Sequence, residues 1–132
     1  MLQKANAVHA VHSDLAPRPG GHYSQAVVHH GIVYCSGQLP VDTGTGKLVQ
    51  GSFEDQARAV LNNLAAVLAA AGSNLQCTLR TTAYLARIED WATFDQVYAR
   101  TFGTHRPART VVAVGALHHG ALIEIDAIAA VL

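Results

Sequence analysis

The chain has 132 residues, of which half are hydrophobic and 14% are charged, and its formal net charge is zero. This length predicts one domain with a sizeable core, and the balanced charge argues against nucleic acid or an anionic membrane surface as a partner. So small a share of charged residues favours the burial of further surface in an oligomer.

No uncharged apolar stretch long enough to span a membrane is present, and the residues after Met1 mix polar and apolar types. We therefore expect a cytoplasmic protein without a membrane partner. Cys35 and Cys77 lie in separate apolar runs without a CxxC motif, which predicts free core thiols.

Residues 1–15 lack periodicity and are predicted to form an N-terminal arm or a short edge strand, before a single domain over residues 16–132. A loop rich in proline and glycine then leads to Tyr23, whose ring we expect to be half-buried with its hydroxyl in water. Ala26–His30 and Ile32–Ser36, separated by Gly31, predict a β-hairpin.

The second strand of this hairpin ends in Ser36, Gly37 and Gln38. Gly37 has no Cβ, so its backbone either approaches a ligand closely or forms an ordinary bulge. The sequence alone favours neither. Val41–Gly51 follows as a turn-rich surface loop.

Two helices are predicted in the middle of the chain. The first begins after Ser52, which forms a variant capping box with Asp55, and ends at Gly72. A strand over residues 77–85 separates it from the second helix, which Asp90 is expected to cap. The second helix has an apolar stripe, composed of Trp91, Phe94, Val97, Tyr98 and Phe102, and ends at Gly103.

The end of the chain contains two apolar runs, Val111–Val114 and Ala121–Leu132, joined by a link that contains glycine. They are predicted to pair as a hairpin, which places Arg109 on the strand next to Glu124 and Asp126, either near them or one pair out of register. Opposite charges in this arrangement form either a structural ion pair or a functional site. The sequence leaves open whether Arg109 and Glu124 of the same chain or of different chains share one site. The order of elements predicts an α+β fold with two helices on one face of a mixed sheet.

Asp95 lies beside the apolar stripe of the second helix and is interpreted first as a carboxylate that the helix dipole favours. The doublets His29-His30 and His118-His119 suggest a metal site at first sight. Neighbouring residues on a strand point to opposite faces, however, and no further ligand stands at metal-binding spacing, so we expect no metal.

Four motifs, taken together, resemble the reactive intermediate deaminase family, which is also called RidA, YjgF or L-PSP endoribonuclease. The resemblance runs from about Ala16 to about Ala130. The motifs are Gly21-His22-Tyr23-Ser24-Gln25, Ser36-Gly37-Gln38-Leu39-Pro40, Pro107-Ala108-Arg109-Thr110 and Ile123-Glu124-Ile125-Asp126-Ala127-Ile128-Ala129.

The resemblance implies a chorismate-mutase-like fold and a homotrimer with a central barrel and sites at the subunit interfaces. It implies hydrolysis of 2-imino acids, such as 2-iminopropionate and 2-iminobutyrate, to 2-keto acids and ammonia, without a cofactor. An arginine on a strand suits such a substrate, because its guanidinium donates two parallel hydrogen bonds to a carboxylate.

In this interpretation the site residues have distinct roles. Arg109 binds the substrate carboxylate, Glu124 positions and activates the water, and Tyr23 closes the cleft between subunits. The substrate-binding residues are Arg109, Gly37, Val111, Ser36 and Asp95.

Two of these positions depart from the family, which often has Cys at Val111 and Asn at Asp95. The negative charge of Asp95 puts the substrate in question. Alternatives are a pathway-specific deaminase of the aminomuconate or aminoacrylate type, a non-catalytic ligand-binding trimer, or an RNA-cleaving trimer, against which the charge balance speaks.

Overall fold

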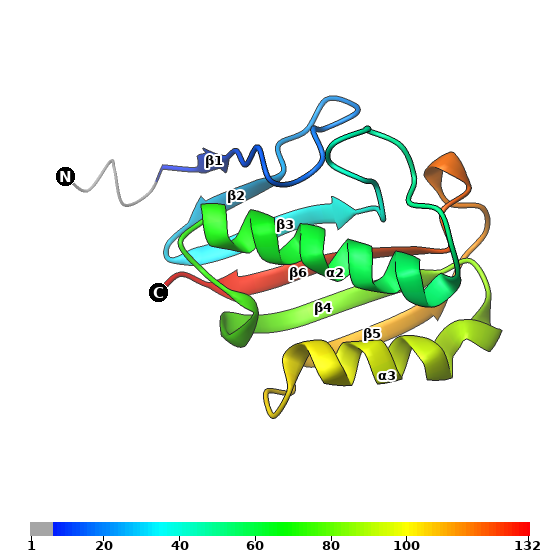
Figure 1. Ribbon diagram of the computed structural model, residues 1–132. Coiled ribbons are helices and arrows are strands. Elements are labelled where there is room, and N and C mark those ends of the chain that lie inside the picture. Colours follow the sequence, from blue (N-terminus) through cyan, green and yellow to red (C-terminus); the bar gives the residue numbers. More distant parts are fainter. Residues whose placement is uncertain (1–6) are drawn as a thin grey trace.

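The computed structural model describes residues 7–132 as a mixed β-sheet with two long helices on one face (Figure 1). The predicted fold class is confirmed. Residues 1–6 of the expected N-terminal arm lie outside the described range. In chain order the elements are β1 (His9–Val11), β2 (Ala26–His29), β3 (Ile32–Gln38), α2 (Phe53–Ala70), η1 (Leu75–Cys77), β4 (Thr78–Leu85), η2 (Ile88–Asp90), α3 (Trp91–Phe102), β5 (Ala108–Ala113), η3 (His118–Gly120) and β6 (Ile123–Ala130).

The strand order is β1-β2-β3-β6-β4-β5, and β4 and β5 run parallel while the other neighbours are antiparallel. The predicted hairpin of the last two strands is therefore wrong, because β4 lies between β5 and β6. A strand-helix-strand connection returns β5 parallel to β4. The link 114–122 then passes the end of β4, where Val114 N–H donates to the Leu85 carbonyl and Ala86 N–H donates to the Leu122 carbonyl.

The core lies between the sheet and the two helices (Figure 1). Along β6 buried and half-buried residues alternate, because successive side chains of a strand point to opposite faces. Ile123, Ile125, Ala127 and Ala129 face the helices and are at most 2% exposed. The other face of the sheet, which carries Glu124, has no helix over it among residues 7–132.

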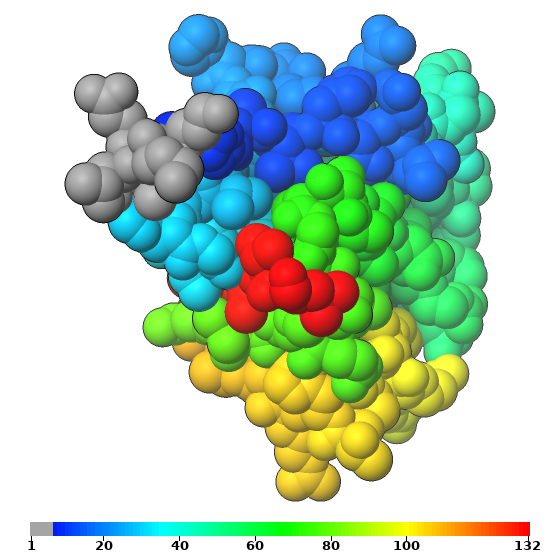
Figure 2. Space-filling view, turned by 90° about the vertical axis from the view of Figure 1, so that its left-hand side faces the viewer, coloured from blue at the N-terminus to red at the C-terminus, as the bar shows by residue number. Residues whose placement is uncertain are grey.

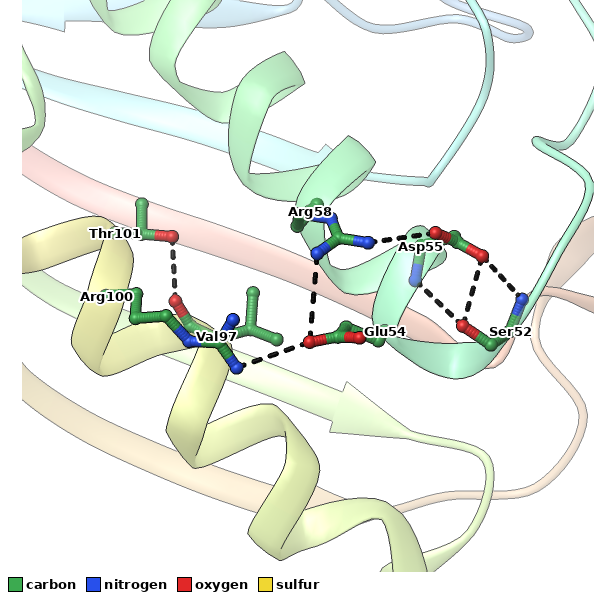
Figure 3. Close-up of polar contacts among 7 residues, drawn as sticks. All are labelled: Ser52, Glu54, Asp55, Arg58, Val97, Arg100 and Thr101. Atoms are coloured by element: carbon green, nitrogen blue, oxygen red, sulfur yellow. Dashed lines mark hydrogen bonds and ion pairs between the residues drawn. The ribbon is translucent and has the colours of Figure 1, made fainter.

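Helix α2 begins as predicted, with a complete capping box between Ser52 and Asp55. Figure 3 shows this box and the polar link between the helices, in which Glu54 pairs with Arg58 of α2 and with Arg100 of α3, at 3.7 and 3.2 Å. The helix ends before Gly72, whose φ of +79° is the left-handed conformation that glycine tolerates best.

Helix α3 departs from the prediction at its start. Asp90 occupies the N-cap position, but its side chain makes no cap hydrogen bond. Asp95 does not lie in the first turn, so the helix-dipole interpretation of this carboxylate is wrong. Its partner is Arg109.

Strand β4 begins at Thr78, one residue later than predicted, because Cys77 belongs to the short helix η1. A register irregularity between Thr78 and Arg80 turns Leu79 outward, where it is 48% exposed. Both cysteines are free thiols. Cys77 is only partly buried, whereas burial raises the pKa of the Cys35 thiol to about 12.

The β2–β3 hairpin is confirmed, and its turn residues His30 and Gly31 have φ values of 50° and 75°. β1 pairs with β2 as an edge strand. Figure 2 shows the end of the molecule where the C-terminal residues lie beside the end of α2. There Leu132 N–H donates to the Gly72 carbonyl at 2.9 Å. Among residues 7–132, no helix is long and apolar enough to cross a membrane.

Candidate functional site

Arg109 is held by contacts from helix α3. It lies on β5 opposite Thr81 of β4, on the helix-covered face of the sheet. Its Nη1 donates a hydrogen bond of 2.9 Å to Asp95 Oδ1. The guanidinium carbon lies 5.6, 5.5 and 4.8 Å from the ring centroids of Trp91, Phe94 and Tyr98. With 20% of its side chain exposed, Arg109 is a positioned cation rather than a solvated one.

The sequence of α3 explains this arrangement. Trp91, Phe94, Asp95 and Tyr98 follow one another at helical spacing, so their side chains share the face that meets β5. The apolar stripe was predicted from this spacing, but its contact with Arg109 was not. Three aromatic residues and one carboxylate on a single helix face are the signal that would have indicated a guanidinium partner.

Tyr98 connects this arrangement to the core. Its hydroxyl lies 2.7 Å from Thr81 Oγ1, which is fully buried. Burial raises the pKa of Tyr98, while the Thr81 hydrogen bond and the charge of Arg109 oppose the shift. The phenol therefore stays neutral and serves as a rigid wall beside the guanidinium.

A cavity of about 530 Å³ opens at Arg109. Its lining includes Asp95, His105 and Arg106. The guanidinium groups of Arg106 and Arg109 favour an anionic ligand, whereas the negative charge of Asp95 weakens the binding of one. The site suits a small carboxylate.

Val111 lies two residues after Arg109 on the same face of β5, opposite Ala83. It is partly buried and packs against the core. The structure thus brings Val111 and Asp95 to the Arg109 side of the sheet, but Val111 is not among the residues that line the Arg109 cavity.

Glu124 lies on the uncovered face of the sheet, opposite Tyr84 of β4. A Cβ placed on Gly37 would overlap its carboxylate, so this glycine makes room for Glu124. Burial raises the pKa of Glu124, the charge of Asp126 raises it further, and His118 lowers it. A carboxylate with a raised pKa is a better proton acceptor than an ordinary one.

Asp126 and Tyr84 support Glu124 from the same face. Tyr84 donates a hydrogen bond of 2.9 Å from its hydroxyl to Asp126 Oδ2. This hydrogen bond is the main reason that the pKa of Tyr84 is raised. The sequence predicts that Asp126 shares a face with Glu124, but it does not indicate Tyr84, because β5 rather than β4 is the predicted neighbour of β6.

Gly37 belongs to a bulge of β3, since the register with β6 shifts between Cys35 and Gln38. The bulge interpretation of this glycine is therefore confirmed, and the Glu124 carboxylate occupies the space that a Cβ at this position would need. Ser36 is engaged structurally, because its Oγ donates to the Ser24 carbonyl at 2.6 Å.

Tyr23 and Gly37 line a second cavity, of about 580 Å³. Tyr23 is 52% exposed, and its hydroxyl accepts a hydrogen bond of 3.2 Å from Gly20 N–H. The same cavity is lined by His118 and His119, whose rings stack at 3.8 Å. No group of three or more potential metal ligands is found in the described part of the chain.

The candidate residues thus fall into two sets on opposite faces of the sheet. Arg109 shares its face with Thr81, and Glu124 shares the other face with Tyr84. The expectation that Arg109 and Glu124 lie on neighbouring strands is wrong. The cause is the pairing of β5 and β6 with opposite sides of β4.

Residues 13–131 match the family model described as Endoribonuclease L-PSP. The chain belongs to this family. This match confirms the resemblance that the four motifs indicate. The proteins similar to this chain include a RutC family protein and a RidA.

Several relatives resemble nearly the whole chain. A RutC family protein of Pyrococcus horikoshii is 43% identical over 90% of this chain and 94% of its own. The human 2-iminobutanoate/2-iminopropanoate deaminase is 40% identical over 86% of this chain and 83% of its own. The crystal structure of E. coli TdcF with bound serine has a TM-score of 0.87 and 34% identity, over 92% of this chain and 98% of its own.

Proposed function

We propose that this protein is an imine deaminase, which hydrolyses 2-imino acids such as 2-iminopropionate and 2-iminobutyrate to 2-keto acids and ammonia. The observation that carries the proposal is the Glu124 carboxylate, which has a raised pKa and occupies the space that the missing Cβ of Gly37 leaves. Family membership and the human relative's name as a deaminase of these two imines support it.

The chemistry needs few groups, because the carbon of an imine is already electrophilic. The substrate carboxylate binds Arg109, which the rings of α3 hold in place. Glu124 takes a proton from water as the water oxygen bonds to the imine carbon, and this proton passes to the imine nitrogen. As the carbon–nitrogen bond of the resulting carbinolamine breaks, its hydroxyl proton passes to the leaving nitrogen, which gives the keto acid and ammonia.

We further propose that the protein works as a homotrimer in which one site takes Arg109 and Glu124 from different subunits. The two side chains lie on opposite faces of the sheet in one chain, so no single chain joins them. The uncovered face also exposes Tyr34 and Val112 by 46% and 38%, and a neighbouring subunit would cover this apolar surface. Tyr23 would close the cleft.

The first test measures ammonia and 2-oxobutyrate release from 2-iminobutyrate, generated in situ by a threonine dehydratase. The wild type should accelerate the release. Arg109→Ala should reduce kcat/KM by about 100-fold, since hydrogen bonds to a charged group are worth up to about 3 kcal/mol. Glu124→Gln should reduce turnover by about 100-fold or more while binding of 2-oxobutyrate persists.

Arg100→Ala is the matched control, because Arg100 is a mostly exposed guanidinium on α3 that pairs with Glu54. It should retain wild-type turnover. Full activity of Arg109→Ala would refute the carboxylate clamp, and a wild type without acceleration would refute the proposed imine deaminase activity.

A mixing experiment tests the shared site. Arg109→Ala and Glu124→Gln chains, each inactive alone, are unfolded, mixed equally and reassembled. If each site takes one residue from each of two chains, about one quarter of the sites regain both groups, and about one quarter of wild-type activity returns. If both residues act within one chain, no activity returns.

A further inference from the structure

The cavity beside Gly37 is larger than a four-carbon imino acid needs. It measures about 580 Å³, within the range of pockets that hold drug-sized ligands. Its lining includes Arg18, which the family resemblance did not assign and which the reaction proposed above does not use. This guanidinium therefore needs its own explanation.

Arg18 is presented by a rigid segment. It stands between Pro17 and Pro19, whose rings fix the backbone φ angle on both sides. The buried side chain of Gln25 donates a hydrogen bond of 2.9 Å to the Pro17 carbonyl, and its Oε1 accepts one of 2.7 Å from Ser13 N–H. Gln25 is 2% exposed, so this anchor is part of the core.

The other end of the segment is tied to the candidate site itself, because Gly20 N–H donates to the Tyr23 hydroxyl. Arg18 thus has a backbone fixed on both sides by prolines, a buried anchor before it and the cavity tyrosine after it. A long side chain on such a fixed backbone loses less conformational entropy on binding a ligand than one on a mobile loop.

The acidic residues that line the cavity are engaged elsewhere. Asp14 lies 2.8 Å from His12 Nε2, and Asp42 Oδ1 accepts hydrogen bonds from the N–H groups of Gly44 and Thr45. Arg18 makes no ion pair with any residue of the described range 7–132. Arg18 is therefore an exposed residue of the cavity lining whose charge no carboxylate of this range neutralises by contact.

We propose that Arg18 is a specificity-determining residue that binds a second carboxylate, on the side chain of the substrate. The preferred substrates are then the imines of acidic amino acids, such as 2-iminoglutarate. A planar guanidinium is the group that best matches a carboxylate, by two parallel hydrogen bonds. This inference rests on the proposed function, in which Glu124 acts beside Gly37 and Arg109 holds the first carboxylate.

The kinetic test compares two imines generated in situ: 2-iminoglutarate from an L-glutamate oxidase, and 2-iminobutyrate. The ratio of their kcat/KM values is measured for the wild type, for Arg18→Ala and for Arg87→Ala. Arg87 is an exposed arginine outside the cavity lining and serves as the matched control. The ratio should fall at least tenfold in Arg18→Ala and stay unchanged in Arg87→Ala.

A binding measurement separates this inference from the proposed function. The dissociation constants of the two products, 2-oxoglutarate and 2-oxobutyrate, are measured by calorimetry for the wild type and Arg18→Ala. Tighter binding of 2-oxoglutarate that is lost in Arg18→Ala supports the Arg18 subsite, even if neither imine is hydrolysed. Equal dependence of both ligands on Arg18, or no dependence, overturns the subsite, even if both imines are hydrolysed.

Discussion

The carboxylate of Asp95 should weaken the binding of anionic substrates, and Asp95→Asn should strengthen it. The substitution keeps an oxygen that can accept the 2.9 Å hydrogen bond from Arg109 but removes the negative charge. A bound substrate carboxylate would lie at about 5 Å from Asp95, and charges near a protein surface interact with an effective dielectric constant of about 20, which gives a repulsion of about 3 kcal/mol before screening. Because 46% of the Asp95 side chain is exposed, water and salt screen this repulsion to about 1 kcal/mol, or about fivefold in affinity.

The assay measures two quantities at low and at high salt: the dissociation constant for 2-oxobutyrate and the Michaelis constant for 2-iminobutyrate. Both should fall about fivefold in Asp95→Asn at low salt, and the difference should shrink as salt screens the charge. The free energy of unfolding should change by less than about 1 kcal/mol, because 46% of the Asp95 side chain is exposed.

A matched control for this prediction is Asp90→Asn, which makes the same chemical change at the start of the same helix. Asp90 holds the N-cap position without a cap hydrogen bond and is paired with no cation among the described residues. Asp90→Asn should leave both the dissociation constant for 2-oxobutyrate and the Michaelis constant for 2-iminobutyrate unchanged. If Asp95→Asn also leaves them unchanged at low salt, the carboxylate does not act on the ligand, and its role is limited to orienting Arg109.

Three further predictions concern other positions. Asp126→Asn removes a charge that raises the pKa of Glu124, so the acid limb of the kcat/KM profile should shift to lower pH; an unmoved limb would mean that another group titrates. Gly37→Ala should cost less than about 1 kcal/mol in unfolding by urea, because only the mobile end of Glu124 must give way, yet turnover should fall about as far as in Glu124→Gln. Ser52→Ala should cost about 1 kcal/mol in the same unfolding experiment, through loss of the capping box shown in Figure 3, and leave turnover unchanged.

Elements that local rules define were predicted well from the sequence. The capping box at Ser52, the stop at Gly72 and the turn at Gly31 each depend on a few neighbouring residues. The pairing of the last two strands was not predicted, because it depends on which strand occupies the middle of the sheet. A parallel partner that returns through a helix leaves no signal in the link between β5 and β6.

The site was predicted only in part for the same reason. Residue type and motif order singled out Arg109 and Glu124, but their mutual position follows from strand order. Leu79 and Cys77 show a second limit, since a register irregularity and a short helix at the start of β4 changed their exposure. A one-residue irregularity in a strand moves a side chain to the opposite face of the sheet. It changes the alternation of polar and apolar residues in the sequence only slightly, so this alternation does not reveal it.

The two sets of candidate residues depend on different parts of the fold. Arg109 depends on α3 for its position, through Asp95 and the aromatic rings, whereas Glu124 depends on the bulge at Gly37 and on Asp126. The two sets share no hydrogen bond or ion pair among those found in residues 7–132. Under the proposed shared site, variants therefore form two groups: a defect on the Arg109 side is complemented in mixed trimers by a defect on the Glu124 side, but never by a second defect on its own side. A pair from one side that restored activity on mixing would contradict the division that the fold imposes.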